Sequence, residues 1–171
     1  CTGANVLTHI GDMPALDYYK HFIGDSMEVI NQFPLAVFDV KSDSFFLRPP
    51  CFIDEPNKAI IFNGTFPDTF EVQLTEMGPD SLLEAAHMAN KQALEEYPGT
   101  YPQLGFQFSC CSRRAHLGTR TPDESQELLG MDHERFRYAG FYSYGEIAPL
   151  EKGGPVRIHN ETYVIVMLGE S

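Results

Sequence analysis

The sequence is poor in basic residues and has no long apolar run. Its 171 residues contain 12 Lys and Arg against 24 Asp and Glu, which gives a formal net charge of −12. Nucleic acids and anionic membranes are bound through basic faces, so this charge argues against both as partners. The longest apolar runs, residues 59–62 and 163–168, are far shorter than the roughly 18 to 20 residues of a membrane-spanning helix. We therefore expect a globular protein without a membrane segment.

Cysteine is also scarce, and the chain contains only Cys1, Cys51, Cys110 and Cys111. The adjacent residues Cys110 and Cys111 could form a disulfide only with strained geometry. No two cysteines have the CxxC spacing that is typical of zinc sites. Free thiols in a reducing compartment are therefore expected, which places the protein in the cytoplasm. Because the chain starts at Cys1 and not at methionine, we expect it to be a processed or excised piece of a longer protein.

Motifs of the common cofactor sites are missing as well. The sequence has no glycine-rich loop that would cradle phosphates and no Gly-x-Ser-x-Gly nucleophile elbow. His9, His21, His87 and His133 are scattered without the spacing of metal ligands. We expect neither a cofactor nor a metal.

Hydrophobic periodicity and turn residues predict one domain over residues 1–171. Helices are expected at residues 14–22, 81–97 and 122–129, the last two each with a capping box at its start. Strands are expected at residues 5–10, 35–40, 44–47, 58–62, 70–75, 104–109, 138–144 and 162–168. The second half alternates strands with helices, and such strand–helix–strand units favour parallel neighbours. The predicted fold is α/β, a mixed sheet with flanking helices.

The first candidate for chemistry follows the strand at residues 104–109. Ligands of open α/β sheets bind beyond the carboxyl ends of parallel strands, where Cys110 and Arg113 fall. No acidic residue occurs between Glu96 and Asp123, whereas that stretch contains three arginines. These arginines either clamp an anion through bidentate hydrogen bonds or pair with the protein's own carboxylates. Both alternatives stay open.

The second candidate is the aromatic stretch from Gly140 to Pro149. Strand alternation would put Tyr142 and Tyr144 on one face, and Gly145 would turn the backbone so that Glu146 lies at the strand's end. Aromatic walls beside one carboxylate suit an ammonium group or another small polar ligand. The alternative is a core strand followed by a surface glutamate.

The third candidate is the tetrapeptide His159-Asn160-Glu161-Thr162 before the last strand. Its side chains supply hydrogen-bond donors and acceptors but have no established catalytic spacing. A histidine at a strand start is more often a structural hydrogen-bonding residue than a general base.

Together these stretches resemble the C-terminal domain of the FIST family, named for F-box and intracellular signal transduction. The resemblance is carried by Ser109-Cys110 with Arg113, Leu117-Gly118, the run Gly140 to Pro149, and His159-Asn160-Glu161-Thr162. The opening residues 11–19 are similar to the family's entry into this domain, although Thr69 and Cys111 depart from its usual pattern. The resemblance implies a sensory or ligand-binding domain of a signal-transduction protein, preceded by a partner FIST N-terminal domain. Small ligands such as amino acids are proposed for that family.

Three functional hypotheses follow. The leading one is a small-molecule-binding sensory domain whose ligand is an amino acid or another small carboxylate. Its candidate ligand-binding residues are Cys110, Arg113, Tyr142, Tyr144, Glu146, His159, Asn160 and Thr162. The second is a cysteine-dependent enzyme that uses Cys110 or Cys111 with His159 as base. The third is a protein-interaction module. The sequence does not indicate an oligomeric state.

Overall fold

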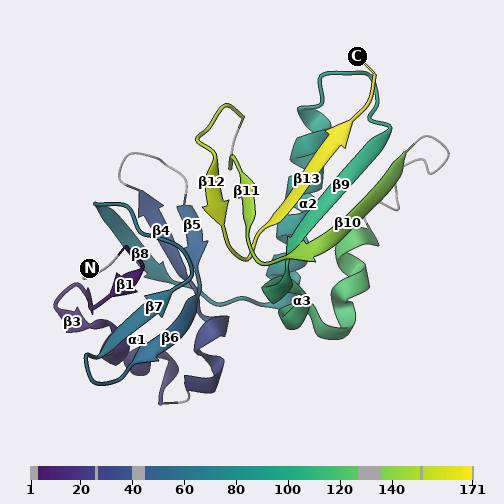
Figure 1. Ribbon diagram of the computed structural model, residues 1–171. Coiled ribbons are helices and arrows are strands. Elements are labelled where there is room, and N and C mark those ends of the chain that lie inside the picture. The colour runs from purple at the N-terminus through teal and green to yellow at the C-terminus, as the bar shows by residue number, and fades with distance from the viewer. Residues whose placement is uncertain (1–3, 26, 40–44, 127–135, 151, 171) are drawn as a thin grey trace. The chain divides into compact units, whose positions relative to one another are not determined.

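The computed structural model describes residues 4–25, 27–39, 45–126, 136–150 and 152–170. The chain divides by its internal contacts into two compact units (Figure 1). Unit 1 comprises residues 1–77 and 149–160, and unit 2 comprises residues 78–148 and 161–171. The prediction of an α/β fold with a mixed sheet and flanking helices is confirmed. Cys1 and the end of the expected helix at residues 122–129 lie outside the described residues.

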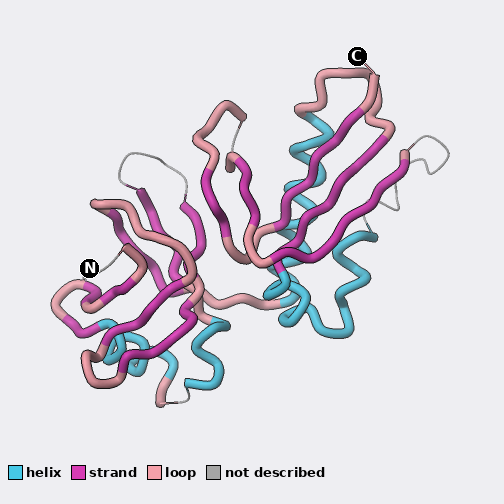
Figure 2. The backbone as a smooth tube through the Cα atoms, viewed as in Figure 1, coloured by secondary structure: helices cyan, strands magenta, loops and turns pink. Residues whose placement is uncertain are grey.

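Unit 1 contains two antiparallel three-stranded sheets, with strand orders β1-β7-β6 and β5-β4-β8 (Figure 2). Its elements are β1 (Val6–Leu7), β2 (His9–Ile10), β3 (Met13–Pro14), α1 (Ala15–Ile23), the 3₁₀ helix η1 (Met27–Gln32), β4 (Leu35–Asp39), β5 (Phe45–Arg48), β6 (Pro50–Asp54), β7 (Ala59–Phe62), β8 (Phe70–Leu74) and β12 (Arg157–His159). One apolar cluster joins both sheets to α1, and its largest fully buried members are Tyr19, Leu35, Ile60 and Phe62. Burial of such side chains supplies most of this unit's stability.

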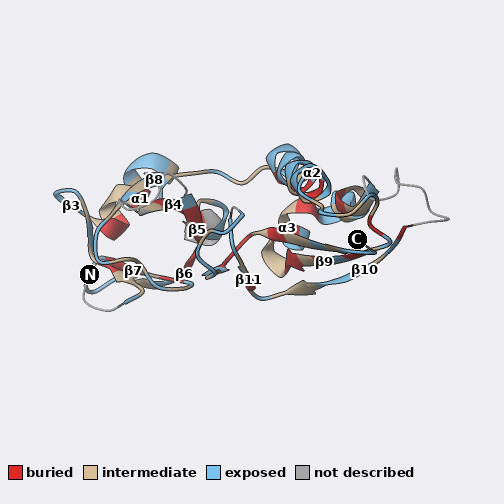
Figure 3. Cartoon of the chain, turned by 90° about the horizontal axis from the view of Figure 1, so that it is seen from above, coloured by how far each residue is buried: buried red, intermediate tan, exposed pale blue. Residues whose placement is uncertain are grey.

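Unit 2 is a three-stranded sheet with helices on one face. Its elements are α2 (Pro79–Glu95), β9 (Leu104–Cys110), α3 (Cys111–Leu117), the 3₁₀ helix η2 (Gly118–Ser125), β10 (Arg137–Ser143), β11 (Glu146–Ala148) and β13 (Tyr163–Leu168). The strand order is β10-β9-β13, with β10 parallel and β13 antiparallel to β9. Figure 3 shows α2 and α3 on the same side of β9 and β10. Leu82, Ala86 and Asn90 form the buried stripe of α2 at helical spacing.

Several expected elements shift or change their neighbours. The helix expected at residues 81–97 begins two residues earlier because Pro79 occupies its first turn, and the Ser81 hydroxyl accepts a hydrogen bond from the Gly78 N–H at 3.3 Å. The strand expected at residues 5–10 is divided into β1 and β2. Strand β6, which begins at the second of the two prolines at residues 49 and 50, was not expected.

Two predictions about the strand–helix–strand units have different outcomes. The unit β9–α3–η2–β10 does make parallel neighbours, as expected. The unit β8–α2–β9 does not, because β8 pairs antiparallel with β4 in unit 1. The helix α2 packs against β13 of unit 2 instead of connecting two neighbours of one sheet.

The capping box expected at the start of the helix at residues 122–129 is not formed. Residues 118–125 form a 3₁₀ helix, in which the Thr121 hydroxyl donates to the Gly118 carbonyl at 2.7 Å. The Glu124 carboxylate turns inward to the buried guanidinium of Arg113. Leaving Arg113 buried without this carboxylate would cost about 3 to 5 kcal/mol, more than the roughly 1 kcal/mol that a helix cap contributes.

Candidate functional site

The predicted ligand-binding residues lie in both units. Those in unit 2 are Cys110, Arg113, Tyr142, Tyr144, Glu146 and Thr162, and those in unit 1 are His159 and Asn160. The predicted residues of unit 2 lie on two different faces of its sheet, because successive side chains of a strand point to opposite faces. The face that the helices cover carries Tyr142, whereas the other face carries Cys110.

The carboxylate of Glu146 links the end of β10 to the residue before β13, on the face of the unit 2 sheet opposite the helices. Ser143 of β10 is paired with Cys110 of β9, and the Cys110 N–H donates to the Thr162 carbonyl at 3.0 Å. The Ser143 hydroxyl donates to Glu146 Oε1 and the Thr162 hydroxyl to Glu146 Oε2, both at 2.7 Å. Glu146 and Cys110 are both 4% exposed. We call this group of four residues the Glu146 site.

Gly145 makes the Glu146 site sterically attainable. Its φ of 151° lies in a region that side chains rarely adopt, so the backbone can turn directly after β10. The expected turn at Gly145 is therefore confirmed, and it leads into β11 with Glu146 as first residue. The alternative of a surface glutamate is wrong, because Glu146 is buried.

Arg113 belongs to a second hydrogen-bond network, on the face of the sheet that the helices cover. Its side chain is 2% exposed; Nε donates to Glu124 Oε1 and Nη2 to the Leu82 carbonyl, both at 2.7 Å. The Tyr142 hydroxyl donates to the other oxygen of Glu124 at 3.1 Å. Burial, followed by the charge of Glu124, raises the pKa of Tyr142 to about 12. Of the two alternatives for Arg113, pairing with the protein's own carboxylates is the one observed.

The remaining parts of the basic stretch and of the aromatic wall lie at the surface. Arg120 pairs with Asp80 at 2.6 Å and with Asp123 at 3.3 Å. Strand β10 ends at Ser143, so Tyr144 does not share a strand face with Tyr142, and it is 92% exposed. The expected pair of aromatic walls is therefore wrong. Arg114 instead places Cζ 5.6 Å from the Tyr142 ring centroid.

The model of the FIST C domain family matches residues 15–149 of this sequence. The chain belongs to this family. No curated protein and no solved structure matches the chain. The matched region of this FIST C domain includes Ser143, Cys110 and Glu146, whereas Thr162, which completes the Glu146 site, follows it in the sequence. The family name refers to signal transduction, and the chain is a domain of that kind.

Among the cysteines that the structure describes, Cys111 does not have the lowered pKa of a nucleophilic thiol. Cys51, Cys110 and Cys111 are free, and Cys110 Sγ accepts a hydrogen bond from the Ser112 hydroxyl at 3.3 Å. Burial, then the neighbouring Cys110 thiol, and more weakly Glu146, raise the pKa of Cys111. A raised pKa lowers the fraction of thiolate at neutral pH, which is the opposite of what a cysteine nucleophile needs.

Glu161 is a buried acid that the sequence did not single out. It is 3% exposed, and its Oε2 has no hydrogen-bond partner among the described residues. Burial raises its pKa to about 8, although the charge of Arg113 opposes this shift. Its φ of 61° is also unusual for a residue with a side chain. Buried and strained polar residues of this kind gather at functional sites.

Among the described residues, no three His, Cys, Asp or Glu side chains are grouped so that they could hold a metal ion. No helix in the described part of the chain is both long and apolar enough to cross a membrane.

Proposed function

We propose that this FIST C domain is a sensory domain that binds a small molecule, and that the Glu146 site receives the ligand's ammonium group. The observation that carries the proposal is a buried carboxylate at the carboxyl ends of the parallel strands β9 and β10. Open α/β sheets bind ligands beyond such strand ends. An amino acid is the ligand class that the family resemblance and this carboxylate both favour.

The chemistry of Glu146 agrees with an ammonium ligand. A carboxylate has about four lone-pair positions, and the hydroxyls of Ser143 and Thr162 use two of them. The two hydroxyls hold both carboxylate oxygens in place, so a ligand would meet an oriented acceptor pair. Arg113 does not take part in this proposed contact, because its guanidinium already donates to Glu124 and to the Leu82 carbonyl. Tyr142, Tyr144, His159 and Asn160 stay predicted ligand residues.

The Glu146→Gln variant is expected to lose stabilisation by amino acids. A thermal-shift series with single amino acids and small carboxylates measures this, with each protein compared to its own ligand-free baseline. Wild-type protein at about 100 times the dissociation constant should gain roughly 2.7 kcal/mol. Glu84→Gln, which removes an exposed carboxylate on α2, is the matched control and should respond like the wild type. The proposal is overturned if no compound stabilises the wild type or if Glu146→Gln responds equally.

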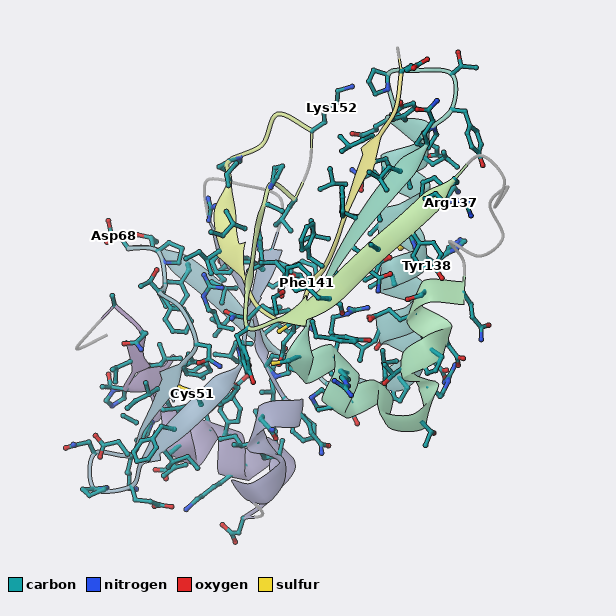
Figure 4. All side chains as sticks on the ribbon, turned by 45° about the vertical axis from the view of Figure 1, so that its right-hand side comes forward. Cys51, Asp68, Arg137, Tyr138, Phe141 and Lys152 are labelled. Atoms are coloured by element: carbon teal, nitrogen blue, oxygen red, sulfur yellow. The ribbon has the colours of Figure 1, made fainter. Side chains whose placement is uncertain are left out.

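A second candidate function is docking onto a FIST N-terminal domain, the partner that the family resemblance implies. The uncovered face of the unit 2 sheet favours it. Phe106, Val166 and Leu168 are 36%, 41% and 48% exposed, and Phe141 is 62% exposed (Figure 4). Phe141 lies beside Phe108 with ring centroids 5.2 Å apart, so the apolar surface is continuous across β10 and β9.

The Phe141→Arg variant tests this second candidate. In a titration of the purified FIST C domain with a purified FIST N-terminal domain, the charge should weaken binding by about tenfold or more, because it would be buried unpaired. Met88→Ser, which removes an apolar side chain of similar exposure from α2, should bind like the wild type. Equal binding by all three proteins, or none by the wild type, would contradict docking through this face.

A further inference from the structure

Three buried polar side chains of unit 2 each have an atom without a hydrogen-bond partner. They are Asn90 of α2, Ser109 of β9 and Glu161, which precedes β13 by two residues. Their exposed fractions are 7%, 1% and 3%. Among the described residues, none hydrogen-bonds to Asn90 Nδ2, Ser109 Oγ or Glu161 Oε2. Because a buried polar atom without a partner destabilises the folded state, three of them in one unit call for an explanation.

The side chain of Tyr163 links these three residues. Tyr163 is the register partner of Ser109 in the antiparallel pair of β13 and β9, so both side chains lie on the same face of the sheet. The Tyr163 hydroxyl donates to Asn90 Oδ1 at 3.1 Å, which identifies this face as the one that the helices cover. Arg113 Cζ lies 5.7 Å from the centroid of the Tyr163 ring, and the charge of Arg113 acts on the carboxyl group of Glu161. The atoms without partners therefore lie around one aromatic side chain.

All three side chains can donate hydrogen bonds. Asn90 Nδ2 carries two N–H groups, and Ser109 carries a hydroxyl. Burial raises the pKa of Glu161 to about 8, against the opposing charge of Arg113, so near neutral pH its carboxyl group is mostly protonated and has an O–H to donate. A water molecule has two lone pairs and cannot accept from three donors at once, whereas a carboxylate has about four lone-pair positions. The donors therefore fit a carboxylate better than they fit water.

The charges around Glu161 favour a ligand with a single negative charge. The charged group that acts on Glu161 is Arg113 of α3, and Arg113 is paired with Glu124 of η2 at 2.7 Å. The residues that α2 buries are uncharged, namely Leu82, Ala86 and Asn90. A carboxylate that accepts two or three hydrogen bonds is well stabilised in its charged form. A dianion such as hydrogen phosphate would in addition need a net positive charge, which the Arg113–Glu124 pair does not supply.

We propose that Asn90, Ser109 and Glu161 form a binding site for a small monocarboxylate between the helices and the sheet of unit 2. The ligand accepts hydrogen bonds from Asn90 Nδ2, from the Ser109 hydroxyl and from the Glu161 carboxyl group, with the Tyr163 ring beside it. Binding depends on the proton of Glu161, because two adjacent carboxylate charges would repel each other. None of these residues belongs to the Glu146 site, so the two proposals stand or fall separately.

Thermal unfolding of the full chain in formate, at pH values from about 7 to 9 and with chloride keeping the ionic strength constant, tests this site. The melting temperature of the wild type should rise and saturate near pH 7. Near pH 9 the half-saturating formate concentration should be about tenfold higher, because Glu161 is then mostly ionised. In Glu161→Gln this concentration should not change with pH, since the glutamine amide keeps a donor and does not titrate. Glu84→Gln, which removes an exposed acid of α2, should keep the pH dependence of the wild type.

A second variant tests the donors and guards against misfolding. Ser109→Ala removes one hydrogen bond to a charged ligand, so the half-saturating formate concentration should rise about tenfold. Ser81→Ala, which removes an exposed hydroxyl of α2, is the matched control and should bind formate like the wild type. Glu146→Gln should also keep the formate response, which separates this proposal from the amino-acid proposal. If Ser109→Ala does not fold, the pH profile of Glu161→Gln decides the question.

Nuclear magnetic resonance locates the bound formate. The formate proton should show a nuclear Overhauser contact with the ring protons of Tyr163, and this contact should weaken as the pH rises. The proposal is overturned if formate gives no saturable stabilisation of the wild type, which would leave water as the partner of these atoms. It is also overturned if the affinity of the wild type does not change with pH, if Ser109→Ala binds equally, or if formate contacts other residues and not Tyr163.

Discussion

Replacing Glu161 by glutamine should stabilise the domain in alkaline solution and leave it nearly unchanged in acid. The pKa of Glu161 is raised from 4.5 to about 8 by burial, so the folded state holds this proton more tightly than the unfolded state does. The stabilising contribution of the proton is complete below the unfolded pKa and is lost as pH rises toward the folded pKa. Above about pH 8 the wild type carries a buried carboxylate charge, whereas the variant carries none.

The size of the effect follows from the shift in pKa. The difference in unfolding free energy between Glu161→Gln and the wild type should grow by about 1.4 kcal/mol per pH unit above the unfolded pKa. It should level off near the folded pKa, after a total change on the order of 5 kcal/mol. Arg113 is the opposing charge that the carboxylate faces, but its Nε is already bound to Glu124, so it offsets only part of the cost.

Urea unfolding at pH values from about 5 to 9 measures this difference. Glu84→Gln, with its side chain exposed on α2, should give a difference from the wild type that does not change with pH. If the Glu161→Gln difference is also independent of pH, Glu161 is ionised in the folded protein and its environment is more polar than its burial indicates. Since no residue that the structure describes donates a hydrogen bond to Oε2, we expect the pH-dependent result.

The sequence was sufficient for features that depend on neighbours along the chain. The turn after β10 follows from Gly145, and the parallel pairing of β9 with β10 follows from the short helices between them. The position of Cys110 and Glu146 at strand ends could therefore be predicted. The sequence could not predict that the hydroxyls of Ser143 and Thr162 donate to the same carboxylate. Thr162 lies in the segment before β13, far from Ser143 along the chain.

Contacts between distant residues account for what was missed. Arg113 had two chemically reasonable partners in the sequence, an external anion or an internal acid, and only the tertiary structure brings Glu124 to it. Arg48 preceded two prolines and looked like the end of a strand, although it is the arginine that contacts Asn160. Glu161 stood inside a recognised motif, but nothing in the motif indicates that it is buried, with one oxygen that has no hydrogen-bond partner in the described part of the chain.

Removing the carboxylate of Glu124 should cause the other large loss of stability. In Glu124→Leu the guanidinium of Arg113, 2% exposed, would remain buried without its ion-pair partner. Breaking a buried pair on one side costs about 3 to 5 kcal/mol, most of it the cost of the charge that is left behind. Tyr142 would lose its acceptor as well, so the loss should be at the upper end of this range. Urea unfolding near neutral pH, with two-state behaviour checked by two probes, measures it.

The double variant Arg113→Met with Glu124→Leu separates the cost of an orphaned charge from the strength of the pair. Replacing both partners by apolar side chains removes the orphan, so the double variant should be clearly more stable than Glu124→Leu alone. The matched surface control is Arg120→Met, whose partners are the exposed Asp80 and the partly exposed Asp123, and it should change the free energy of unfolding little. The double variant is compared with Glu124→Leu and Arg113→Met, each made alone. If the losses of unfolding free energy in these two single variants simply add in the double variant, Arg113 and Glu124 act independently. Arg113 then does not depend on Glu124 to remain charged inside unit 2.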